Sequence, residues 1–110
     1  MLDDWKWKWN WGEASFSIDL VDNEGNNIAY ITRCDYDVWN CYFNNPAVKD
    51  SLSLTLTGIE SPEEVIWKST VWIYDECNKI ANSYHHIRDH LPSLHELHEK
   101  YEKSKEIKNE

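Results

Sequence analysis

Five histidines lie close together in the second half of this 110-residue chain, and imidazole is a common metal ligand. They are His85, His86, His90, His95 and His98. His86 and His90 have a four-residue spacing that suits two ligands on one helix. The segment HELHE (95–99) does not match the HExxH zinc motif, because its second histidine comes one residue too early. Pro92 also separates the two groups, so we expect exposed histidines on charged helices and no metal site.

The cysteines do not form a recognisable redox or zinc motif. Cys34, Cys41 and Cys77 are odd in number, and none of them belongs to a CxxC pair. We therefore expect three reduced thiols that do not pair, mostly as small buried groups. The sequence also has neither a glycine-rich phosphate loop nor a GxSxG motif. It predicts a protein that is not an enzyme, with no catalytic residues and no cofactor.

The segment WKWKWNW (5–11) places four tryptophans on alternate positions. Such a row serves as half of a core, as a stacking platform for bases or sugars, or as a protein-binding surface. Base stacking requires a basic groove, and few basic residues lie nearby. We expect most of Trp5, Trp7, Trp9 and Trp11 to be buried and at least one to remain exposed as an interface anchor.

The charge of the chain limits its partners. Twenty acidic residues outweigh eleven basic ones, for a net charge of −9. Such a chain repels nucleic-acid phosphates and anionic lipid, and is attracted to basic protein surfaces. No apolar run approaches the ~18 residues of a membrane-spanning helix. The start MLDDWKWK lacks the apolar region of a signal peptide, so we expect a cytoplasmic protein of a bacterial host cell.

Period-two patterns predict an antiparallel sheet over residues 5–57. The apolar phase changes from odd to even positions near Gly12–Glu13, which predicts a bulge or bend there. Turn formers at 22–27 and 35–37 separate the strands that follow. These strands are IAYITRC (28–34), VWNCYF (38–43) and SLSLTLT (51–57).

The second half of the chain is predicted to be helical. Ser61, Pro62 and Glu64 form a helix start with a capping box. Apolar residues then recur at three- and four-residue steps, which predicts one long helix over 62–91 ending before Pro92. Ser93 begins a shorter helix over 94–103, and 104–110 is expected to fray. We thus expect a single α+β domain over 1–110: an antiparallel meander of about four strands followed by a long helix and a short C-terminal helix.

Two kinds of residue are candidates for partner binding. Acidic residues gather around the two predicted hairpin turns, where they would meet basic groups of a partner. Aromatic residues beside them would anchor the contact. The candidates are Trp5, Trp7, Asp19, Asp22, Glu24, Asp35, Tyr36, Asp37 and Trp39.

The strands IAYITRCDYDVWNCYF and the helix entry GIESPEEVIWKSTVWIYDECNKI resemble small accessory proteins of phages and mobile elements. In those proteins a tryptophan-rich meander precedes a G-apolar-x-S-x-E-E helix entry, and the resemblance spans about residues 5–90. It implies an anti-defence role, including that of anti-CRISPR inhibitors that occupy the nucleic-acid channel of an effector nuclease. The acids of this chain are scattered rather than gathered in one run.

The resulting hypothesis is a non-enzymatic anti-CRISPR-like inhibitor. It would bind a basic, nucleic-acid-handling protein, such as a Cas effector nuclease, and block its nucleic-acid site without binding nucleic acid or membrane itself. One alternative is a nucleic-acid-associated regulatory domain that uses an aromatic sheet face. Another is a module that forms a homodimer through its long helix.

Overall fold

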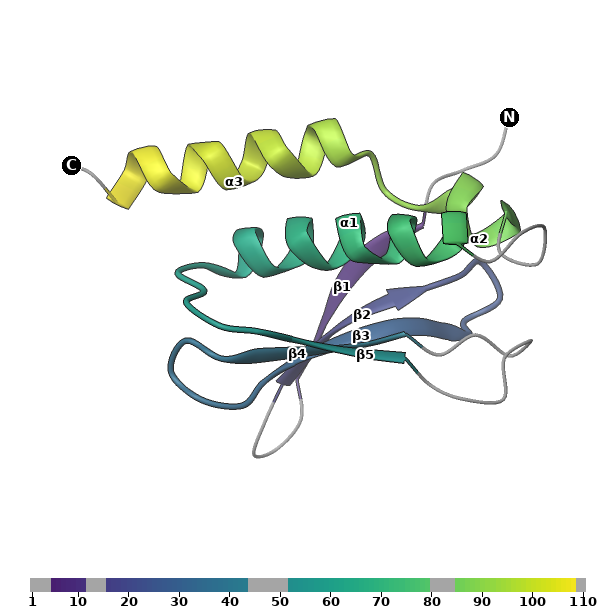
Figure 1. Cartoon of the computed structure of the whole chain (residues 1–110), viewed down its shortest axis with the longest axis horizontal. Helices are drawn as coiled ribbons and strands as arrows, with labels where there is room; N and C mark the ends of the chain where they lie inside the picture. The colour runs from purple at the N-terminus through teal and green to yellow at the C-terminus, as the bar shows by residue number, and fades with distance from the viewer. Residues whose placement is uncertain (1–4, 12–15, 44–51, 80–84, 109–110) are drawn as a thin grey trace.

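The computed structural model describes residues 5–11, 16–43, 52–79 and 85–108, which form an antiparallel sheet followed by helices (Figure 1). The strands are β1 (Lys6–Trp11), β2 (Phe16–Val21), β3 (Asn27–Arg33), β4 (Trp39–Phe43) and β5 (Leu52–Leu56). The helices are α1 (Pro62–Lys79), α2 (His85–His90) and α3 (Leu94–Lys108). The strands lie in chain order across the sheet, so the predicted α+β meander is confirmed. No helix in these ranges is long and apolar enough to cross a membrane.

The sheet has five strands rather than about four, because β1 and β2 are separate strands of one hairpin. Their register pairs Trp7 with Leu20, Trp9 with Ile18 and Trp11 with Phe16. Odd positions of β1 and even positions of β2 therefore share a face, which accounts for the change of apolar phase between the two strands. An irregularity does occur elsewhere, between Leu20 and Val21. The predicted bend at 12–13 lies outside the described residues.

Helix α1 packs on one face of the sheet and separates it from α3 (Figure 1). Residues of α1 at four-residue spacing enter the core, as expected for one helix face. They are Val65, Ser69, Ile73 and Cys77. The sheet contributes Ile18, Leu20, Ala29, Ile31, Cys41 and Phe43. The other face of the sheet carries mainly polar side chains and has no described helix over it (Figure 1).

The predicted single helix over 62–91 is wrong, because α1 ends at Lys79 and α2 is a separate helix. Arg88 of α2 donates a hydrogen bond to the side-chain oxygen of Asn78 at the end of α1 (3.1 Å). In one straight helix these residues would be about 15 Å apart along the axis. The chain therefore folds back between the two helices. The connecting residues 80–84 lie outside the described residues.

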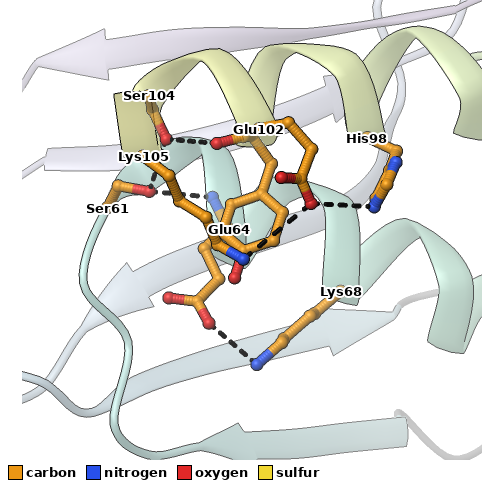
Figure 2. Close-up of polar contacts among 8 residues, drawn as sticks. Ser61, Glu64, Lys68, His98, Glu102, Ser104 and Lys105 are labelled. Atoms are coloured by element: carbon orange, nitrogen blue, oxygen red, sulfur yellow. Dashed lines mark hydrogen bonds and ion pairs between the residues drawn. The ribbon is translucent and has the colours of Figure 1, made fainter. Parts of the chain in front are cut away.

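Helix α3 lies along α1 on the side away from the sheet (Figure 1). The ring of Trp67 on α1 stacks on Tyr101 of α3, with centroids 5.3 Å apart. The predicted end of this helix at residue 103 is wrong, since α3 continues to Lys108. Ser104 is tied down, because its Oγ donates to the carbonyl of Tyr101 (2.7 Å) and lies 3.4 Å from the Oγ of Ser61 (Figure 2). Of the predicted frayed tail, residues 109–110 lie outside the described residues.

The start of α1 at Pro62, with Ser61 before it, is as predicted. Ser61 Oγ accepts a hydrogen bond from the N–H of Glu64 (3.2 Å), and Glu64 Oε1 accepts one from the N–H of Glu60 (2.8 Å). Lys68 forms an ion pair with the other carboxylate oxygen of Glu64 at 2.8 Å (Figure 2). Two N–H groups at the start of α1, those of Glu60 and Glu64, thus have side-chain acceptors.

Replacing Ser61 by alanine should lower the free energy of unfolding by about 1 kcal/mol, because the N–H of Glu64 loses its acceptor. Chemical denaturation followed by circular dichroism measures this. Ser61→Thr should retain most of the stability, and Ser53→Ala, at an exposed strand position, is the control. Equal stability of Ser61→Ala and the wild type would show that the cap contributes nothing.

The pKa of Glu64 should make the stability of the protein fall in acid. Burial alone would raise this pKa, but the hydrogen bond from the N–H of Glu60 and the ammonium group of Lys68 outweigh it and hold the pKa below its ordinary value of 4.5. The ionised form is therefore favoured by folding, and its stabilising effect is present above pH 4.5 and disappears as the pH falls through the lowered pKa.

Glu64→Gln should accordingly be less stable than the wild type at pH 7, with the difference shrinking below pH 4.5. Urea unfolding midpoints measured from pH 7 to pH 3 test this. Glu63→Gln, in the same helical turn, is the matched control. A difference between Glu64→Gln and the wild type that stays constant over this range would contradict the assignment.

Candidate functional site

The tryptophan row is divided between its two ends. Trp5 is buried and stacks on the His90 ring, with centroids 4.8 Å apart. Its backbone N–H donates to the carbonyl of His90 (2.7 Å). Trp7 is half-buried and donates its indole N–H to Thr70 Oγ1 on α1 (2.9 Å). These two indoles join β1 to the helices, so their role is in packing.

Trp9 and Trp11 point to the same side of the sheet but remain 43% and 71% exposed. Their rings stack 5.4 Å apart, and Phe16 lies 5.3 Å from each. The expectation that at least one indole remains exposed is confirmed, but the expectation that most are buried is wrong, because only Trp5 is buried and Trp7 is half-buried. The helices decide which end of the row is covered, because His90 stacks on its first indole and Thr70 contacts its second.

Strand register brings more residues to the end of the sheet where Trp11 lies. Trp11 pairs with Phe16, and Arg33 pairs with Trp39. The pair Ser17–Thr32 lies one step away, so Phe16 is beside Arg33. Phe16 and Trp39 meet edge to face, with centroids 5.9 Å apart. One transverse row of large side chains therefore crosses this end of the sheet.

Arg33 connects this row to the turn between β3 and β4. Its guanidinium donates to the carbonyls of Asp35 and Tyr36, and lies over the rings of Tyr36 and Trp39 at 5.4 and 5.7 Å from their centroids. The carboxylate of Asp35 accepts the N–H of Tyr36 (2.7 Å). These contacts fix the turn while the Tyr36 side chain is 84% exposed. We call Trp9, Trp11, Phe16, Arg33, Tyr36 and Trp39 the aromatic end.

A cleft of about 500 Å³ separates the aromatic end from the segment that leads into α1. Residues 58–62 line its other side, and the N–H of Ile59 donates to the carbonyl of Asp37 (3.1 Å). Gly58 has a φ of +69°, a conformation that glycine adopts without strain. Asp37 and Glu60 are acidic groups on the cleft wall, and Arg33 is its basic group. The charge of the cleft wall is thus negative beside an aromatic surface.

The structure distributes the nine predicted binding residues over several places. Asp35, Tyr36 and Asp37 lie at the aromatic end, where Trp39 forms buried support. Asp22 and Glu24 lie in the β2–β3 turn, at the opposite end of β3. Trp5 lies near that turn, and Trp7 packs against α1.

The two turns separate because consecutive hairpins of a meander reverse at opposite sheet ends. Asp22 organises its own turn. Its loss of solvation acts to raise its pKa, but hydrogen bonds from Asn26 and from the N–H of Glu24 outweigh this and lower the pKa. Asp19 lies on the open face, is mostly buried, and accepts hydrogen bonds from Asn10 (3.1 Å) and Ser17 (2.8 Å). The predicted acids therefore do not form one continuous surface.

The sequence prediction missed Phe16 and Arg33, and it named Trp5 and Trp7 rather than Trp9 and Trp11 as the binding candidates of the tryptophan row. The available signal was the symmetry of a hairpin: Trp11 and Phe16 flank a short connection and must face each other. Arg33 and Trp39 flank the β3–β4 turn in the same way.

The histidines and cysteines do not assemble a chemical centre in the described residues. No group of three or more His, Cys, Asp or Glu side chains there is arranged to hold a metal ion. His95 and His98 are exposed and lie near Glu99 and Glu102 on α3, whereas His90 is buried, contrary to expectation. The side chains of His85 and His86 lie outside the described residues.

All three cysteines are unpaired, as predicted. Cys34 is exposed, whereas the other two are buried in the core. Burial raises the pKa of Cys41 to about 12 and that of Cys77 to about 11. Both remain thiols at neutral pH and are therefore poor nucleophiles.

Comparison with models of protein families, with curated proteins and with solved structures gives no match to this chain. The case for a function therefore depends on the aromatic end and the charges around it.

Alanine substitutions should separate the packed tryptophans from the exposed ones. Trp5→Ala should cost about 3–5 kcal/mol of stability, because it leaves a cavity beside His90. Trp11→Ala should change stability by no more than about 0.5 kcal/mol, because its indole is largely in solvent. Thermal and urea unfolding of both variants provides the measurement. Equal losses from the two changes would mean that the whole row belongs to the core.

Proposed function

We propose that this protein is non-enzymatic and acts by binding another protein through the aromatic end. The observation that carries the proposal is the exposure of Trp9, Trp11 and Tyr36 at one end of a well-packed sheet. Tryptophan and tyrosine are frequent anchors of protein interfaces, since each buries a large area while fixing few torsions. Phe16 and Arg33 hold these rings before any partner arrives, which lowers the entropic cost of binding.

The charge around the aromatic end supports a basic partner. Asp35 and Asp37 flank Tyr36 in the sequence, and Glu60 stands across the cleft. The guanidinium of Arg33 is engaged by backbone carbonyls and aromatic rings. With a net charge of −9 on the chain, the long-range field also attracts positive surfaces. Lysine and arginine side chains of a partner would meet these acids while its apolar groups cover the rings.

We place the partner among proteins that handle nucleic acid, because their binding channels combine basic groups with aromatic and apolar surface. Covering such a channel is the action that the resemblance to anti-defence proteins implies. The inhibitor competes with nucleic acid by its bulk and by its carboxylates, which take positions that phosphates would occupy. A Cas effector nuclease in a bacterial cytoplasm is the first partner to test.

The open face of the sheet favours a second candidate, a domain that binds nucleic acid. Tyr30 and Tyr42 are half-buried there and stack on each other, with centroids 4.8 Å apart. Lys6 and Lys8 are exposed on the same face, as the β1–β2 register requires. Aromatic rings and lysines on one face are elements of a base-stacking surface. The acidic net charge and the buried carboxylate of Asp19 on this face oppose it.

Tyr36→Ala should weaken binding to a captured partner by about 2 kcal/mol, or roughly 30-fold, because it removes the most exposed anchor. The partner is first isolated from a bacterial lysate on immobilised protein and identified by mass spectrometry. Its affinity for each variant is then measured by calorimetry. Asp37→Asn should slow association and reduce its dependence on salt.

Ser53→Ala, on the open face, is the matched control and should bind like the wild type. Unchanged affinity of Tyr36→Ala would reject the aromatic end as the binding surface. A mobility-shift assay at physiological salt tests the second candidate. Tight binding of oligonucleotides by the isolated protein, lost in Tyr30→Ala, would replace the proposed function with that one.

A further inference from the structure

Strand β1 is an edge of the sheet. In the residues that the structure describes, β2 is the strand paired with it. A protected edge is usually short, charged or covered, because an open edge offers backbone donors and acceptors to another strand. Lys6 and Lys8 supply some charge, but two exposed indoles on the same six-residue strand work against protection. The combination indicates an edge that receives another strand.

We propose that β1 pairs in antiparallel fashion with β1 of a second copy of this chain, centred on Trp9. A symmetric antiparallel pair has its two-fold axis perpendicular to the sheet, so residues of equal parity face each other. Centring on Trp9 puts Lys8 opposite Asn10 and Trp7 opposite Trp11. Centring on Lys8 would instead place two lysines directly opposite, which is unfavourable.

The polar side of this pairing has balanced charges. Within one copy, Lys8 is directly opposite Asp19 on β2. In the dimer its other neighbour is Asn10 of the second copy, whose amide group is hydrogen-bonded to the Asp19 carboxylate of that copy (3.1 Å). Lys8 of each copy therefore lies between Asp19 of its own chain and Asn10 of the other chain. No like charges meet across this part of the seam.

The apolar side of this pairing matches a projecting ring to a groove. A groove of about 410 Å³ runs between β1 and the helices. Its apolar walls are Trp7, Trp9, Ile66, Pro92 and Leu97, and its polar rim is formed by Lys6, Glu63, Ser93, Glu96 and Lys100. Because Trp11 of the second copy is opposite Trp7, its indole would enter this groove. The two-fold symmetry repeats this contact, so the exposed Trp11 indole of each copy becomes covered. This reciprocal fit identifies a second copy as the occupant.

Sedimentation equilibrium of the purified protein tests the dimer without any other partner. At about 0.1 mM chain, the mass should approach twice the 13.1 kDa of one chain. Added salt should increase the fraction of dimer, because it screens the repulsion between two chains that each have a net charge of −9. Trp11→Ala should be monomeric. Tyr36→Ala removes a ring that is as exposed but lies off β1, and it should remain dimeric. A monomeric wild type, or a dimeric Trp11→Ala variant, would overturn the proposal.

Cross-linking tests the register. In a Cys34→Ser background, Trp9→Cys places two thiols on the axis, where opposite Cα atoms are about 4.5–5.5 Å apart and a disulfide can form. Lys6→Cys keeps the Trp11 indole and places its two thiols about 20 Å apart, since six residues of strand separate them. We expect a covalent dimer on oxidation of the first variant and not of the second. The reverse pattern, or no cross-link in either, would overturn the Trp9-centred pairing.

These tests are independent of the proposed function. A dimer that captures no partner would reject the proposed function and support this inference. A monomer whose partner binding depends on Tyr36 would do the opposite.

Discussion

One helix, α1, packs on a five-stranded sheet, and the rest of the molecule follows from how much of the sheet it can cover. Its core stripe, from Val65 to Cys77, is buried against one face of the sheet. A helix is about 10 Å wide, whereas five strands span roughly twice that or more. Side chains at the margin must therefore pack on one another or remain in solvent. Strand β1 is one such margin, where Trp9 and Trp11 remain exposed and pack on each other and on Phe16.

The outer side of α1 is also occupied. Trp67 lies off the core stripe, and Tyr101 and His98 of α3 pack against it. Ser61 and Ser104 bring the two helix ends together (Figure 2). Helix α1 thus has the sheet on one side and α3 on another, which reduces the surface that it could offer to a second copy. The edge of β1 is a better surface for a second copy, because β1 is the outermost strand of the sheet and two of its indoles are exposed.

Local signals in the sequence predicted the elements that depend on neighbouring residues. Alternation predicted the strands, and the Ser61–Glu64 pair predicted the start of α1, because cap and helix lie within one turn. The fold-back after Lys79 was not predicted, since the apolar stripe continues through Ile80 and Ala81 as if the helix did. A periodic pattern records which residues are apolar, and it leaves open whether one helix or two packed helices bury them.

The candidate site was harder to predict, because it depends on contacts between distant residues. Alternation placed all four tryptophans on one face, but only the position of His90 decides which end of the row is covered. Asp22 and Asp35 looked alike as turn acids, yet β3 separates them by its full length. Strand order alone would have separated these turns, whereas the burial of Trp5 required knowledge of where α2 folds back.

Both proposed surfaces include Trp11, and this sharing has a thermodynamic consequence. In the Trp9-centred dimer the indole of Trp11 lies in the groove of the second copy, whereas Tyr36 and Asp37 remain outside the seam. A partner that needs Trp11 must compete with the second copy, and its binding would favour the monomer by mass action. A partner that uses only the Tyr36 turn binds both forms equally and leaves the dimer intact. The exposed ring at the end of β1 therefore determines whether self-association and partner binding are coupled.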